Sequence, residues 1–139
     1  KMLILNKEVR NIWVDKMNKI NKNNLSEFMR YYHDFHDSYI IDIHYDILSS
    51  KIECILDVCW SGKPILKGNS YETNKTKMKL IFENVVKYEN KGIYSWDYIN
   101  KGFLDYVRMG DKEKICFATD INSPLVIIVC DSIEYEKIK

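Results

Sequence analysis

Residues 39–60 read YIIDIHYDILSSKIECILDVCW, and this stretch decides the fold class. On both sides of a turn at Leu48 to Ser50, residues alternate with a period of two, which is typical of strands with one face in the core and one in water. The two segments therefore predict an antiparallel hairpin. The residues expected to face the core are Tyr39, Ile41, Ile43, Tyr45, Ile52, Cys54, Leu56, Val58 and Trp60.

Two amphipathic helices are expected before this hairpin. From Lys7 to Ile20 the apolar residues recur at steps of three and four, which places them on one helical face. Asn24 followed by Glu27 has the spacing of a capping box, and it predicts the start of a second helix that ends near Asp34. The buried face of that second helix should comprise Leu25, Phe28, Met29 and Tyr32.

After the hairpin, the sequence predicts a long loop and then further strands. Residues 61–76 contain Gly and Pro with little periodicity, which is typical of a loop. Alternation returns at 77–82, in a strand expected to continue with a distortion through 85–86, and again at 103–109 and 113–119 around a turn at 110–111. Residues 125–130, LVIIVC, predict a central strand buried on both faces, with 132–136 as its polar continuation. The pattern leaves open whether Tyr94 to Asn100 is helix or loop.

Length and element order predict one α+β domain over residues 1–139. Its helical part should cover 1–35, with two N-terminal helices. Residues 36–139 should then form a mainly antiparallel meander of roughly six strands.

Composition narrows the classes of partner. The chain is 46% hydrophobic and 13% aromatic, which is too apolar for a disordered protein. Its 21 Lys and Arg and 20 Asp and Glu are interspersed, so no basic stripe for nucleic acid is predicted. No run of 18 apolar residues occurs, and the opening KMLIL is too short for a signal peptide, so neither a membrane span nor secretion is expected. The four cysteines lack CxxC spacing, and they favour reduced thiols in the cytoplasm.

A His/Asp cluster lies where the second helix meets the hairpin. His33 and His36 have an H-x-x-H spacing beside Asp34 and Asp37, a set of residue types that could bind zinc. The helix is expected to end there, and no fourth ligand follows at a usual spacing. We therefore interpret His36, Asp37 and Ser38 as a structural joint with hydrogen bonds to the turning backbone, and we predict no metal and no cofactor.

The motifs of common enzymes are missing from the sequence. It contains neither G-x-S-x-G nor a Gly-rich phosphate loop. The acidic residues of the hairpin fall on its expected solvent face, which is ordinary for an antiparallel sheet. The protein is therefore predicted not to be an enzyme, with no catalytic residues.

Aromatic residues in irregular segments are the second feature of the sequence that indicates a function. Tyr71, Tyr94, Trp96 and Tyr98 fall in the two irregular segments, Ser61 to Thr76 and Tyr94 to Asn100. Tyr and Trp often anchor interfaces, and loops carry much of the binding function of proteins. These four residues are the predicted partner-binding site.

Three segments carry a resemblance to a known group of proteins. FHDSYIIDIHYD (35–46), KLIFENV (79–85) and LVIIVCDSIEYEKI (125–138) resemble small, mostly uncharacterised bacterial domains, some of them associated with the immunity proteins of polymorphic toxin systems. The sharpest match is His36-Asp37-Ser38. The resemblance implies a cytoplasmic, non-enzymatic domain with a protein partner, and it offers no catalytic residues.

The leading hypothesis is thus a cytoplasmic protein-binding domain, of the kind that neutralises a toxin by covering its site. The near-neutral net charge favours recognition through aromatic and polar loop contacts. The alternative is a small-molecule or metal-binding domain that uses His33, His36 and Asp37, with an enzyme third. Neither nucleic acid nor a membrane is an expected partner, and the oligomeric state is not predicted.

Overall fold

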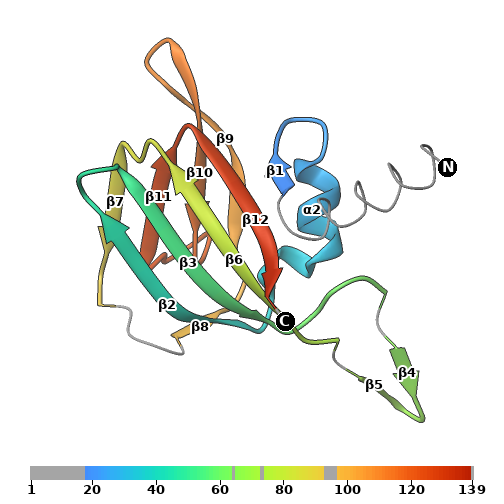
Figure 1. Cartoon of the computed structure of the whole chain (residues 1–139). Helices are drawn as coiled ribbons and strands as arrows, with labels where there is room; N and C mark the ends of the chain where they lie inside the picture. The colour runs from blue at the N-terminus through green and yellow to red at the C-terminus, as the bar shows by residue number, and fades with distance from the viewer. Residues whose placement is uncertain (1–17, 64, 73, 93–96, 139) are drawn as a thin grey trace, which may run out of the picture.

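Strands dominate the computed structural model, which describes residues 18–63, 65–72, 74–92 and 97–138 (Figure 1). It is 57% strand and 9% helical, with one α-helix and three sheets, so the predicted α+β fold with two N-terminal helices and one six-stranded meander is wrong. The elements are β1 (Asn18–Ile20), α2 (Leu25–Tyr31), the 3-10 turn η1 (His33–Phe35), β2 (Ser38–Asp46), β3 (Lys51–Val58), β4 (Ile65–Lys67), β5 (Ser70–Glu72), β6 (Thr76–Glu83), β7 (Lys87–Asn90), β8 (Asp97–Ile99), β9 (Phe103–Met109), β10 (Lys112–Ala118), β11 (Val126–Cys130) and β12 (Ser132–Ile138).

The predicted hairpin is confirmed by the antiparallel pairing of β2 with β3. Along β3 the alternation holds without interruption, because all four predicted core residues are fully buried. Along β2 it breaks: Ile40 pairs with Leu56 and Asp42 with Ile55, so Ile41 is an extra, bulged residue. The bulge changes the phase, and Ile40 is buried while Tyr39 is exposed.

The hairpin lies within a six-stranded sheet whose order is β1-β12-β6-β3-β2-β8. The order is no meander, because β12 pairs with β1 and β6, and β8 pairs with the first residues of β2. Asn18–Ile20, the end of the expected first helix, is therefore a strand, and the rest of that predicted helix lies outside the described residues. Pairing across the sheet has overridden a local helical pattern here.

A second sheet has the order β7-β11-β10-β9 and packs on the first. In chain order the strands change sheet four times, from β6 to β7, β7 to β8, β8 to β9 and β11 to β12, and two of these crossings lie at residues 84–86 and at Asp131. The two crossings lie side by side, because Asp131 N–H donates to Glu83 O at 3.0 Å and Val86 N–H to Val129 O at 2.8 Å. The segments predicted as one distorted strand (77–86) and as one strand with a polar continuation (125–136) thus each contribute to both sheets.

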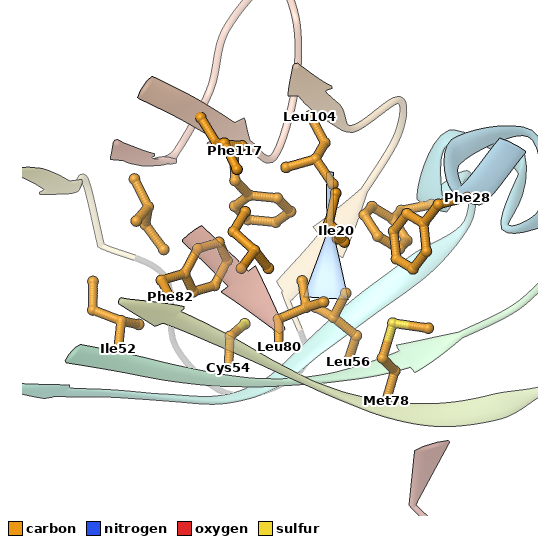
Figure 2. Packing of buried hydrophobic residues seen from close by; sticks show 14 of the residues in the cluster. Ile20, Phe28, Ile52, Cys54, Leu56, Met78, Leu80, Phe82, Leu104 and Phe117 are labelled. Carbon is orange, nitrogen blue, oxygen red and sulfur yellow. The ribbon is translucent and has the colours of Figure 1, made fainter. Parts of the chain in front are cut away.

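The core fills the space between the two sheets (Figure 2). Phe82 of β6 and Phe117 of β10 meet there with ring centroids 5.4 Å apart. Burial of this many apolar side chains is the main term that stabilises the sandwich. The labelled residues of Figure 2 come from both sheets, from β1 and from α2: Ile20, Phe28, Ile52, Cys54, Leu56, Met78, Leu80, Phe82, Leu104 and Phe117.

Helix α2 covers one open side of the sandwich. Phe28 packs against Tyr135 of β12 with ring centroids 4.6 Å apart, and the helix also contacts β9. The predicted buried face of the second helix is confirmed. The predicted capping box is wrong, because the Asn24 side chain instead accepts a hydrogen bond from Asn21 N–H and donates one to Lys19 O.

Candidate functional site

Residues 33–38, which include the FHDS segment (Phe35–Ser38), form the joint between α2 and the sheet, and four of them have left-handed backbone conformations. His33, Asp34 and Phe35 have φ values of 53°, 53° and 57°, and Asp37 has 61°. Three consecutive non-glycine residues in this region are costly, since the left-handed conformation disfavours L-residues by roughly 1–2 kcal/mol each. Phe35 offsets part of that cost, because its fully buried ring packs against Phe28 and Phe117.

Ser38 and Asp37 make hydrogen bonds to the end of β3. Ser38 is fully buried, and its Oγ accepts the backbone N–H of Cys59 at 3.2 Å. Asp37 Oδ2 accepts the indole N–H of Trp60 at 3.3 Å, and Trp60, expected to point inward, is half-buried. Ser38 thus accepts a backbone donor, but one that lies just beyond β3, and its predicted role in the turning backbone stays a prediction.

The two histidines hold the joint to distant loops. Nε2 of His33 lies 2.7 Å from Gly62 O, and Nδ1 of His36 lies 2.6 Å from Asn100 O. A carbonyl only accepts, so each of these two nitrogens carries a proton. His36 thus makes a hydrogen bond at the joint, but its side chain is half-exposed rather than packed as expected, and its structural role stays a prediction.

The histidine cluster offers a poor metal geometry. His36 Nε2 lies 3.4 Å from Asp37 Oδ2, while His33 is directed to a different loop. Within the described ranges no three His, Cys, Asp or Glu side chains gather closely enough to hold a metal ion.

The predicted long loop, 61–76, contains a small hairpin of β4 and β5. This hairpin extends away from the sandwich (Figure 1), and its two strands form a sheet of their own. Leu66 and Tyr71 are cross-strand partners, 61% and 62% exposed. At its base, Gly62 N–H donates to Tyr31 O at 2.7 Å, which ties the hairpin to the end of α2.

Of the other predicted partner-binding residues, only Tyr98 falls in a described element. Its backbone lies in β8 and pairs with Tyr39. Tyr94, Trp96 and the side chain of Tyr98 lie outside what the structure describes. Figure 1 shows β8 and the β4–β5 hairpin at the same end of the molecule, with the hairpin extending away from it.

An open groove between α2 and the start of β9 was missed by the sequence reasoning. This α2–β9 groove has a volume of about 730 Å³ and adjoins a second hollow of about 550 Å³ that reaches His33 and His36. Its charged lining includes Lys22, Arg30 and Lys101, which come from three separate segments. No short-range spacing in the sequence links these residues, so only the folded structure shows that they lie together.

The four cysteines are free thiols. Burial raises the pKa of Cys54 and of Cys130 to about 12, and burial also raises the pKa of Cys59 and of Cys116. A reactive cysteine needs a lowered pKa, because the thiolate is the nucleophile. These four side chains therefore lack the activation that a catalytic thiol shows.

Comparisons of the chain with protein-family models, with curated proteins and with solved structures found no match. Within the described residues, no helix has the length and apolar character needed to cross a bilayer.

Proposed function

We propose that this protein is a non-enzymatic, cytoplasmic protein-binding domain of the immunity type, which neutralises a toxin by covering its site. The β4–β5 hairpin is the part that contacts the partner. The observation that carries the proposal is the exposure of Leu66 and Tyr71 on this hairpin, which extends into solvent.

Two physical arguments support a binding role for the hairpin. An isolated two-stranded hairpin is only marginally stable in water, so contact with a partner would stabilise it further. Tyr71 also offers a large amphipathic surface with few rotatable bonds, which limits the entropy lost on binding.

The cytoplasmic assignment rests on cysteine chemistry. Four free thiols, two of them fully buried in strands, suit a reducing compartment, where disulfides are rare. The resemblance of residues 35–46 to immunity-type domains supports the same location and suggests a toxin as the partner.

The proposal is tested with the protein encoded by the neighbouring gene. We expect that protein to be toxic when produced alone and harmless when co-produced with this chain. In calorimetric titrations of the two proteins, Leu66→Ala with Tyr71→Ala should raise Kd at least tenfold, or about 1.4 kcal/mol.

The matched control is Leu48→Ala, which removes a 99% exposed leucine from the β2–β3 turn. It should leave both Kd and the melting temperature unchanged. An unchanged Kd for the hairpin variant would exclude the hairpin as the contact. Hydrolytic activity that is lost with His36→Ala would replace the binding role with an enzymatic one.

A further inference from the structure

The α2–β9 groove combines an apolar floor with a cationic rim. Leu25, Met29 and Leu104 form part of the floor, and they are among the buried core residues. Lys22, Arg30 and Lys101 lie along the rim. The groove is open to solvent, unlike a small-molecule site, which typically buries 70–90% or more of its ligand.

Two of the rim cations are available to a ligand. Arg30 and Lys101 are exposed, and neither makes an ion pair with any residue in the described part of the chain. Lys22 differs, because it pairs with Glu113 and also lies 5.4 Å from the centre of the Tyr106 ring. Arg30 and Lys101 line both the groove and the adjoining hollow, so they stand where the two meet.

The charge of the neighbouring segment has the same sign. Residues 61–77, which include the β4–β5 hairpin, contain four lysines and one glutamate, a net charge of +3. The chain as a whole carries +1, so the remaining residues carry −2, with 17 Lys and Arg against 19 Asp and Glu. Because His33 is hydrogen-bonded to Gly62 O, this basic segment begins beside the hollow. A positive field at one end of a nearly neutral protein steers acidic partners to that end.

We propose that the α2–β9 groove receives an extended segment of a protein partner in which acidic and apolar residues alternate. The acidic side chains pair with Arg30 and Lys101, and the apolar ones lie over Leu25, Met29 and Leu104. This inference rests on the proposed protein-binding function, and it adds a second contact surface and the chemistry of the segment that occupies it.

A peptide fits the groove better than a nucleic acid. Asp34 and Asp105 also line it, and a phosphate backbone has no hydrogen-bond donor to offer their carboxylates. Peptide N–H groups, in contrast, donate hydrogen bonds to carboxylates. The apolar floor likewise suits aliphatic side chains and has no counterpart in a sugar-phosphate chain.

The test uses the full chain and a defined probe, a peptide of about twelve residues in which Glu and Leu alternate. Binding is followed by amide chemical shifts during titration, which detect weak complexes and locate them. We expect the largest shifts at residues 22–34 and 100–106. Arg30→Glu with Lys101→Glu should weaken binding at least tenfold. The matched control, Lys91→Glu with Lys112→Glu, reverses two exposed lysines outside the groove and should change Kd less than twofold.

Three results would overturn the inference. They are no shift at the groove, shifts confined to residues 61–77, or equal binding of a peptide with Lys in place of Glu. Stronger binding of a single-stranded oligonucleotide at the same residues would assign the groove to nucleic acid instead. The titrations of the hairpin variants with the toxin do not use this peptide. A groove that does not bind the peptide and a chain that does not bind the toxin are therefore separate results, the first against this inference and the second against the proposed function.

Discussion

At the scale of single residues, Ser38 shows how one hydroxyl connects the joint to the sheet. Among the residues that the structure describes, it is one of three buried polar residues, with Ser61 and Thr119. Each is hydrogen-bonded: Ser38 to Cys59 N–H, Ser61 to Asn74 O, and Thr119 to Leu125 and Val126 N–H. Buried polar groups are tolerated only when they are satisfied in this way.

Replacing Ser38 with Ala should lower the free energy of unfolding by about 1–3 kcal/mol, because it leaves the part-buried Cys59 N–H without this acceptor. Urea denaturation measures the change. Ser123→Ala, at an exposed turn, is the control and should stay within about 0.5 kcal/mol of the parent. If the two variants were equally stable, the Ser38 hydrogen bond would make no measurable contribution to the free energy of unfolding.

At the scale of elements, the sequence could predict those strands whose pattern is local and uninterrupted. In β3 and β6 every second residue is buried, so a period of two was sufficient to assign their faces. In β2 the bulge at Ile41 inserts one residue, and a single alternating pattern cannot follow both halves of such a strand. Strands β1 and β8 have three residues each, and their pairing partners lie far away in the sequence. Local propensity holds no information about such pairing.

The bulge predicts different costs for two adjacent isoleucines. Ile40→Ala should destabilise the protein by about 2–5 kcal/mol, because the residue is 1% exposed and pairs with buried Leu56. Ile41→Ala removes the same atoms from a half-buried position and should cost at least about 1 kcal/mol less. Thermal or urea unfolding distinguishes the two variants. A greater loss of stability for Ile41→Ala would indicate that Ile41 faces the core, as the uninterrupted alternation of the sequence predicts.

Only part of the candidate site could be predicted from the sequence, again because local patterns hold no information about contacts between distant residues. The HDS residues and Tyr71 stand out by type and by position between periodic segments, so they could be selected. The groove could not be, because Arg30 and Lys101 are far apart in the chain and are brought together by the packing of α2 against β9.

At the scale of the whole molecule, two sheets share one buried cluster, and this predicts that they unfold together. Cys54 lies in β3 of the six-stranded sheet, and Cys130 lies in β11 of the four-stranded sheet. Because the pKa of each thiol is raised to about 12, the reactive thiolate is scarce at pH 8 in the native state.

Labelling with iodoacetamide at pH 8, followed by mass spectrometry, should therefore modify Cys54 and Cys130 at one common rate that is set by global unfolding. Cys59, which is half-buried beyond the end of β3, should react sooner. Modification of Cys130 well ahead of Cys54 would show that the four-stranded sheet opens independently.

The position of β12 affects the order in which the strands can pair while the chain is being synthesised. This strand lies between β1 and β6, yet it follows both of them in the sequence by a long stretch of chain. Until residue 138 has emerged, β1 has no strand to pair with and β6 presents an open edge. Nascent chains with such edges are prone to aggregate. Folding of the six-stranded sheet can therefore be completed only after β12 has been synthesised, and until then the chain exposes these edges.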